Sequence, residues 1–167
     1  MQTAHSIEQF YEKPDPWAFQ TNPADHYRKG RIIGTLYGFG PFESALDIAC
    51  GEGWITQDIP AREIFGYELS QKAALRFPSV VKHVTNPIGK FDLVMVTGAL
   101  YAHYDWEHMV DMINAHAGNI ILLSNVAAWE VPGIENLIQA KQIVCSEYDY
   151  EPAPGSDFRQ RLRVFRV

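Results

Sequence analysis

A glycine-rich turn follows the first buried strand that the sequence predicts. Residues 44–49 form a short apolar run that contains Asp47, and Gly51 and Gly53 come directly after it. Glycines straight after a strand let the backbone approach a nucleotide-like ligand closely, at the carboxyl end of the strand. A dinucleotide-binding turn would have a third glycine at position 56, where this chain has Thr56. Asp47 is poorly placed for a phosphate and well placed for an ammonium group, so the pattern predicts a ligand that combines a nucleoside with an amino acid.

A second acidic residue stands where the ribose of such a ligand would lie. Glu68 ends the next predicted strand, twenty-one residues after Asp47. A carboxylate at that position can accept both hydrogens of a ribose diol. The fourth predicted strand, residues 91–96, is apolar, which is typical of a strand covered on both faces. Thr97 and Gly98 follow it and are expected at the same edge of the sheet.

Together these features resemble one enzyme family. The run from Asp47 to Gly53, then Glu68, then the fourth strand resemble the class I S-adenosylmethionine-dependent methyltransferases. Residues 15–19 (Asp-Pro-Trp-Ala-Phe), followed by residues 26–31, are similar to the nodulation N-methyltransferases and their relatives. Members of that group methylate an amino-sugar oligosaccharide. The resemblance covers nearly the whole chain and implies S-adenosylmethionine as the cofactor.

The resemblance implies residues for the methionine end of the cofactor. Asp47 would face the methionine amino group, directly or through water. Either Arg28 or Arg31 would reach the methionine carboxylate, and the sequence does not choose between them. Thr97 and Gly98 would lie near the same end.

The resemblance also implies residues for the nucleoside end. Glu68 would hold the ribose, with Leu69 beside the adenine. Other adenine contacts would come from backbone or from Asn86, because this chain lacks the acid that relatives often place near the end of the third strand. The turn after the first strand would flank the cofactor through Ala49, Cys50, Gly51 and Gly53.

The acceptor side departs from the family pattern. Relatives often have a Ser-Glu pair where this chain has Thr97-Gly98, so a proton acceptor must come from elsewhere. A histidine titrates near neutral pH and suits an amine or hydroxyl acceptor. The candidate bases just beyond the fourth strand are His103, Tyr104 and Asp105, while His26 and Tyr101 are further candidates to face the pocket. The alternative for each of these residues is a structural role in a loop or in packing. Trp17, Phe19 and Trp129 are expected to line the acceptor side of the pocket, and Trp17 could instead anchor the N-terminal segment.

Alternating strands and helices position these residues. Such alternation indicates parallel strands joined by crossover helices, and the turn at residues 152–155 indicates a closing hairpin. The predicted fold is α/β: a Rossmann-like three-layer sandwich with a seven-stranded, mostly parallel sheet and a C-terminal antiparallel hairpin. Asp25 is a candidate cap for a helix that ends before Gly38. The strands are expected at 44–49, 63–68, 80–84, 91–96, 119–123, 142–148 and 159–167, and the other helices at 54–58, 71–77, 106–117 (ended by Gly118) and 134–140.

The chain is expected to consist of two segments. Residues 1–40 are expected to form an N-terminal lid segment and helix, and residues 41–167 the cofactor-binding methyltransferase domain. The chain of 167 residues leaves no room for an inserted substrate domain. The lid must therefore come from the N-terminal segment or from a second subunit, and a monomer and a homodimer are both compatible with that.

Composition restricts the partners. With 14 Lys and Arg against 20 Asp and Glu, the net charge of -6 argues against nucleic acid or an anionic membrane as a partner. The chain shows no signal sequence and no apolar stretch of ~18 residues, so a cytoplasmic location is expected. The histidines have no metal-like spacing, and no metal is expected. Cys50 and Cys145 are expected to be buried free thiols, and a solvated strand face is expected for Arg159, Arg161, Arg163 and Arg166.

The leading function is methyl transfer from S-adenosylmethionine to an oxygen or nitrogen of a small molecule, with a sugar or amino-sugar as the acceptor class suggested by the resemblance. One alternative is a non-catalytic protein that binds S-adenosylmethionine as a sensor or partner subunit. A less favoured alternative is a nicotinamide-dependent oxidoreductase, because Thr56 replaces the third glycine of the dinucleotide turn.

Overall fold

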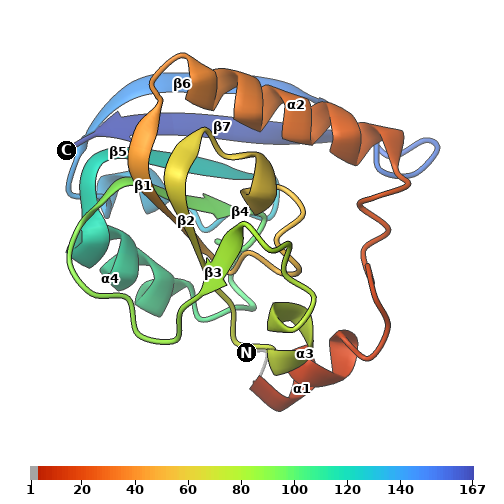
Figure 1. Ribbon diagram of the computed structural model, residues 1–167. Coiled ribbons are helices and arrows are strands. Elements are labelled where there is room, and N and C mark those ends of the chain that lie inside the picture. Colours follow the sequence, from red (N-terminus) through yellow and green to blue (C-terminus); the bar gives the residue numbers. More distant parts are fainter. Residues whose placement is uncertain (1–3) are drawn as a thin grey trace.

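The computed structural model describes residues 4–167, which form a seven-stranded sheet. The strand order is β3-β2-β1-β4-β5-β7-β6 (Figure 1). Strand β7 runs antiparallel to both of its neighbours, β5 and β6, and the other pairs of neighbouring strands are parallel. The predicted mostly parallel sheet with a C-terminal hairpin is therefore confirmed. The strands are β1 (Phe42–Ile48), β2 (Ala61–Tyr67), β3 (Val81–His83), β4 (Phe91–Thr97), β5 (Ala117–Val126), β6 (Lys141–Tyr150) and β7 (Phe158–Arg166).

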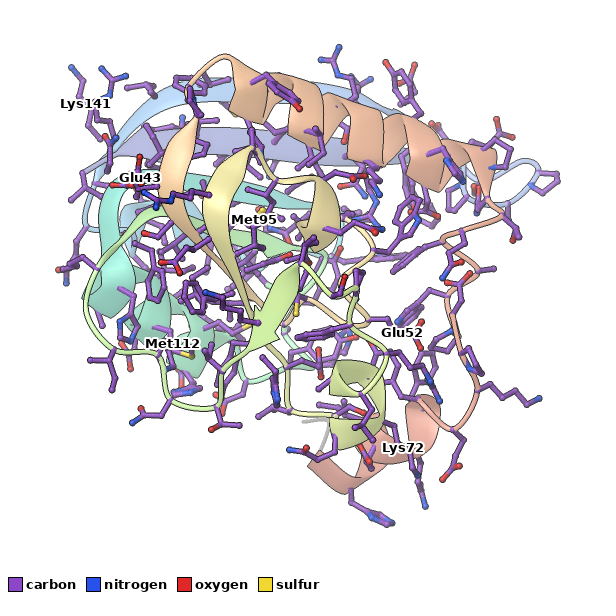
Figure 2. The ribbon with its side chains drawn as sticks, viewed as in Figure 1. Glu43, Glu52, Lys72, Met95, Met112 and Lys141 are labelled. Carbon is purple, nitrogen blue, oxygen red and sulfur yellow. The ribbon has the colours of Figure 1, made fainter. Side chains whose placement is uncertain are left out.

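Helices cover both faces of this sheet, as Figure 1 shows for α2 (Pro23–Tyr37) and α4 (Trp106–His116). Successive residues of a strand point to opposite faces. Leu93 and Met95 of β4 therefore pack into the core beneath α2, whereas Val94 and Val96 pack into the core beneath α4. All four are completely buried, which explains why this strand reads as an unbroken apolar run. Met112 projects from α4, on the opposite side of the sheet from α2 (Figure 2).

The remaining helical segments are short. They are η1 (Thr56–Asp58), α3 (Gln71–Ala74) and η2 (Ile134–Asn136). Ser70 caps α3, because its side chain accepts a hydrogen bond from the Ala73 N–H. The predicted helix over 134–140 is confirmed only as a single 3₁₀ turn over Ile134–Asn136. Ile134 and Ile138 are buried at a helical spacing, but the backbone after the 3₁₀ turn is irregular. Gly118 does not end α4 either, since β5 already begins at Ala117.

Helix α2 begins three residues earlier than the sequence suggested. Its cap is Asn22, whose side chain accepts a hydrogen bond of 3.0 Å from the Ala24 N–H. Pro23 suits the first helical position because its φ is already helical and its missing N–H is not needed there. The expectation that Asp25 caps this helix is therefore wrong. Asp25 is 1% exposed and pairs with Arg28 instead.

The N-terminal segment crosses the carboxyl ends of β1 and β2. It comprises α1 (Ala4–Phe10), which the sequence did not predict, and an irregular stretch over 11–22 that leads to α2 (Figure 1). Glu8 accepts a hydrogen bond of 2.6 Å from Ser70 Oγ, just beyond β2. Arg76 donates to Glu52 at 2.7 Å and to the Tyr11 carbonyl at 3.0 Å. Glu52 lies beside this segment in Figure 2.

The expected solvated face of β7 is found at two of its four arginines. Arg159 and Arg166 are exposed, and Arg159 pairs with two acids of β6. Arg163 is 5% exposed, and its Nη1 lies 2.6 Å from both carboxylate oxygens of Glu130. Arg161, which is half-buried, also donates to Glu130, at 3.0 Å. The expectation is therefore wrong for Arg163, because the buried carboxylate of Glu130 pairs with it.

The two cysteines are free, as expected, but neither is fully buried. Cys145 is exposed, because β6 is the edge strand of the sheet. Cys50 is half-buried in the turn after β1, where burial and the neighbouring Asp47 raise the pKa of its thiol.

Candidate functional site

A cavity of about 840 Å³ opens at the carboxyl ends of β1, β2 and β4, beneath the N-terminal segment. This is the edge at which open α/β sheets bind their ligands. The walls come from the turn after β1, the end of β2, the loop after β4 with the start of α4, the N-terminal segment as far as Arg28, the end of β5, and the closing hairpin of β6 and β7. Among residues 4–167, no three His, Cys, Asp or Glu side chains form a metal-binding group, and no helix is long and apolar enough to cross a membrane.

The turn after β1 is built on left-handed backbone. Ala49 and Gly51 both have φ +58°, and Gly53 has φ +75°. A Cβ added to Gly51 would come 2.8 Å from Tyr11 Oη, so a side chain at this position would displace the N-terminal segment. Gly53 does not line the cavity; it packs against Pro78, 3.2 Å from where its Cβ would be. Gly51 thus keeps the backbone open to the cavity, and Gly53 fixes the turn from behind.

Glu68 lines the cavity just beyond the end of β2. One carboxylate oxygen accepts a hydrogen bond of 2.9 Å from the Gly51 N–H, and the other accepts one of 2.9 Å from the Ser70 N–H. Burial raises the pKa of this carboxyl group, and the two backbone donors oppose that effect. Each oxygen keeps a further lone pair, so the carboxylate can accept two hydrogen bonds from a diol.

Asp47, at the end of β1, is 1% exposed. Its Oδ2 accepts a hydrogen bond of 2.7 Å from Thr56 Oγ1. Its Oδ1 has no hydrogen-bond partner among residues 4–167. Burial raises the pKa of Asp47 to about 7, with Glu68 adding to the effect. Thr56 therefore occupies the place of a third glycine for a reason: its hydroxyl holds this carboxylate in position.

The structure separates the two candidate arginines. Arg28 is 3% exposed and lines the cavity, with its guanidinium 5.0 Å from the centre of the Phe19 ring. Its Nη1 is directed toward the end of β4, 3.8 Å from where a Cβ of Gly98 would be. Arg31 lies over the ring of Tyr148 and is not among the cavity-lining residues.

The loop after β4 supplies the wall opposite the glycine turn. Tyr101 Oη accepts a hydrogen bond of 3.1 Å from the Val126 N–H, and burial raises the pKa of Tyr101 to about 12. His103 and Tyr104 lie side by side, with ring centres 4.2 Å apart. Asp105 caps α4 by accepting from the His108 N–H at 3.4 Å, which gives it a structural role besides its place in the cavity wall.

The cavity brings together most of the residues that the sequence singled out. Arg31, Gly53 and Asn86 lie outside it, the last an exposed residue in the connection from β3 to β4. His26 is also outside it, against the ring of Trp54. The lining includes Arg28, Asp47, Ala49, Cys50, Gly51, Glu68, Leu69, Thr97, Gly98, Tyr101, His103, Tyr104 and Asp105, and also the aromatic residues Trp17, Phe19 and Trp129.

Sequence reasoning missed several lining residues with polar groups. Tyr11 and Glu52 approach from the N-terminal segment and the glycine turn, and Asp25, Tyr150 and Gln160 lie at the other end of the cavity. Tyr150 and Gln160 belong to the closing hairpin, more than 120 residues from Asp25 along the chain. For Tyr150 and Gln160, the one available signal was a polar group at a strand position where the alternation predicts a buried residue.

The fold matches known structures over nearly the full chain. The chain has the fold of the class I S-adenosylmethionine-dependent methyltransferases. The N-methyltransferase NodS from Bradyrhizobium japonicum WM9, in complex with S-adenosyl-L-homocysteine, superposes with a TM-score of 0.79 at 17% identity, covering 98% of this chain and 97% of that one. Magnesium protoporphyrin IX methyltransferase (ChlM) from Synechocystis PCC 6803, with bound SAM, superposes with a TM-score of 0.74 at 14% identity, covering 100% and 98%.

These similarities establish the fold and leave the methyl acceptor open, because the names of the two neighbours refer to different kinds of methyl acceptor. No protein-family model matches the sequence, and no curated protein matches it.

Proposed function

We propose that this protein binds S-adenosylmethionine and transfers its methyl group to an oxygen or nitrogen of a small molecule. The observation that carries the proposal is Asp47: a fully buried carboxylate with one oxygen held by Thr56 and the other without a partner in residues 4–167, in a cavity beside a glycine turn. A buried acceptor of this kind needs a donor, and an ammonium group supplies one with the matching charge.

The rest of the cavity fits the same ligand. Glu68 can accept both hydroxyls of a ribose, and Gly51 leaves the backbone open beside it. Leu69, which is 51% exposed, offers an apolar surface for the adenine. Arg28 is proposed for the methionine carboxylate, because it lines the cavity and Arg31 does not. The cofactor, when bound, supplies a methyl group activated by a sulfonium, and the neighbours NodS and ChlM were crystallised with S-adenosyl-L-homocysteine or SAM.

His103 is the candidate we propose for removing a proton from the acceptor. It lines the cavity beside Tyr101, with ring centres 5.8 Å apart. Burial raises the pKa of Tyr104, which keeps that hydroxyl protonated near neutral pH. Asp105 is engaged as the cap of α4. A neutral imidazole can take up a proton in this pH range, so the remaining histidine suits the role.

A small acceptor is favoured by the size and cover of the cavity. Its volume of about 840 Å³ lies within the range of small-molecule pockets, roughly 300–1,000 Å³. The N-terminal segment lies over it, tied down through Arg76 and Glu52, and we propose that this segment acts as the lid that excludes water. The net charge of -6 also disfavours a nucleic-acid substrate.

Calorimetric titration with S-adenosylhomocysteine tests the proposal, with NAD as the control ligand. We expect micromolar binding of S-adenosylhomocysteine and none of NAD. Binding of NAD alone would point to the oxidoreductase alternative, and binding of neither would refute the cofactor assignment. Methyl transfer to candidate acceptors is then measured with His103→Gln: lower turnover with unchanged cofactor affinity is expected, whereas a tight complex without turnover on any acceptor would favour the non-catalytic alternative.

A further inference from the structure

Gln160 of β7 carries an amide whose oxygen has no hydrogen-bond partner among residues 4–167. The residue is 2% exposed and lines the cavity. Buried side-chain amides almost always find a partner, so an unpaired one calls for an explanation. Because this oxygen belongs to a cavity-lining side chain, a ligand in the cavity is the natural source of the missing donor.

The strand register places Gln160 near the loop after β4. Gln160 stands opposite Val126 of β5. The backbone N–H of Val126 donates to Tyr101 Oη, and Val126 packs in one cluster with Tyr101 and Tyr150. Directly opposed residues of an antiparallel pair lie about 5 Å apart, so the Gln160 amide belongs to the same wall as these two rings.

A charge pair completes this end of the cavity. Asp25 Oδ1 accepts hydrogen bonds from Arg28 Nε and from Tyr150 Oη, both at 2.9 Å. Asp25 is 1% exposed and lines the cavity. Its charge is balanced by Arg28, and Gln160 is neutral. Because Asp25 Oδ1 already accepts two hydrogen bonds, an ammonium at Gln160 would exchange its hydration for a neutral amide, and a carboxylate there would face another acceptor. A hydroxyl can donate to the Gln160 oxygen without bringing a charge into the cavity.

This end of the cavity lies next to the carboxyl end of β4. A Cβ on Gly98 would come 3.8 Å from Arg28 Nη1 and 3.8 Å from Tyr101 Oη, so the absent side chain leaves space between them. Trp129 packs edge-on against Tyr101, with ring centres 5.9 Å apart, and is 48% exposed. Aromatic walls of this kind favour the flat face of a ring compound.

We propose that Gln160, together with Asp25 and Tyr150, binds a hydroxyl group of the methyl acceptor. The acceptor is therefore an uncharged, hydroxylated ring compound. This inference rests on the proposed function, because it places the acceptor beside the methionine end of the cofactor. It assigns specificity to a residue of the closing hairpin, which is far along the chain from the glycine turn and Glu68.

Three matched six-membered rings test the class of ligand: cyclohexane-1,2-diol, cyclohexylamine and cyclohexanecarboxylate. Each is titrated by NMR into the protein with S-adenosylhomocysteine bound. We expect the diol to bind most tightly, and Gln160→Leu to weaken its binding about tenfold. Gln142→Leu is the matched control: the same change at an exposed position of β6 should leave diol binding unaltered.

Tighter binding of the amine or the carboxylate, equal diol binding by Gln160→Leu, or binding of none of the rings overturns the inference. Gln160→Asn serves if the leucine variant does not fold, since it keeps a polar amide but shortens it, and it should also lose diol affinity. Calorimetry with S-adenosylhomocysteine separates the two levels. A wild-type protein that fails to bind it refutes the proposed function, whereas intact cofactor binding without diol selectivity refutes only the Gln160 subsite.

Discussion

Glu68 accepts a hydrogen bond of 2.9 Å from the backbone N–H of Gly51, which ties the end of β2 to the turn after β1. The contact joins the two features that the sequence alone had marked as the nucleoside side of a ligand site. Glu68 therefore has two roles at the cavity: it is the proposed acceptor of the ribose hydroxyls, and it anchors the glycine turn.

Glu68→Gln should weaken binding of S-adenosylhomocysteine by about 10- to 100-fold, equivalent to ~1.4–2.7 kcal/mol. The amide replaces one carboxylate oxygen by a donor, which cannot accept from a ribose hydroxyl or from the backbone. Glu63→Gln is the matched control, since Glu63 lies on the same strand with its side chain paired to Lys82 at the surface. Equal affinity of the Glu68 variant and wild type by calorimetry would show that the ribose is held elsewhere.

Asp47 should make ligand binding and folding stability depend on pH in opposite directions. Its pKa is raised from 3.8 to about 7, so between these values the folded protein keeps a proton that the unfolded chain has lost. Stability contributed by this group is therefore lost as pH rises from ~4 to ~7, while affinity for an ammonium-bearing ligand increases.

Asp47→Asn removes both dependences. Thermal denaturation at pH 8 should show a variant more stable than wild type by about 1–2 kcal/mol, because a buried charge is replaced by a neutral group. Calorimetry at the same pH should show loss of S-adenosylhomocysteine binding. A variant that is destabilised at pH 8, or one that keeps full affinity, contradicts this account.

Gly51→Ala should uncouple the N-terminal segment from the turn. The new Cβ would meet Tyr11 Oη at 2.8 Å, in addition to about 1–2 kcal/mol of strain from φ +58°. Gly89→Ala is a matched control, because Gly89 has φ +81° and nothing within 4 Å of an added Cβ. Both variants should lose stability, but only Gly51→Ala should speed hydrogen exchange in residues 11–22 and reduce cofactor affinity. Identical exchange in the two would mean that Tyr11 does not hold the segment.

Glu130→Gln should be the most destabilising of these changes, at about 3–5 kcal/mol. Glu130 is the buried partner of Arg163 and also accepts from Arg161 and from Asn125. Asn125 in turn accepts from the Leu100 N–H, so the loop after β4 depends on this carboxylate. The loss corresponds to roughly 6–20 °C in Tm for a domain of this size. Glu147→Gln, at the more exposed partner of Arg161, should lose less than about 1 kcal/mol.

The sequence predicted the parts of this molecule that depend on local pattern. Hydrophobic patterns located every strand to within a few residues, most clearly β4, because a strand buried on both faces needs an apolar residue at each position. The glycine turn could be read because a backbone conformation with positive φ restricts the residue type at a few consecutive positions. These two signals place Asp47 and Glu68 at one edge of the sheet without any knowledge of the structure.

Features that depend on contacts between distant segments could not be predicted. Asp25 was expected to cap a helix, because its actual partner Tyr150 lies 125 residues away and no local pattern indicates that contact. Arg163 looked like a surface residue because its partner Glu130 is 33 residues away. The choice of Arg28 over Arg31 depends on which face of α2 meets the sheet, and both positions carry the same side chain.

The cavity is assembled from opposite ends of the chain. Asn22 donates to the carbonyl of Pro152 at 2.9 Å, so the segment leading into α2 is tied to the loop of the closing hairpin. The proposed cofactor side, by contrast, is built from residues between β1 and the end of β4, with Arg28 of α2 as the exception. Acceptor preference can therefore diverge through changes near the two termini while the cofactor half stays constant. A relative with the same glycine turn and a different hairpin would be expected to modify a different compound.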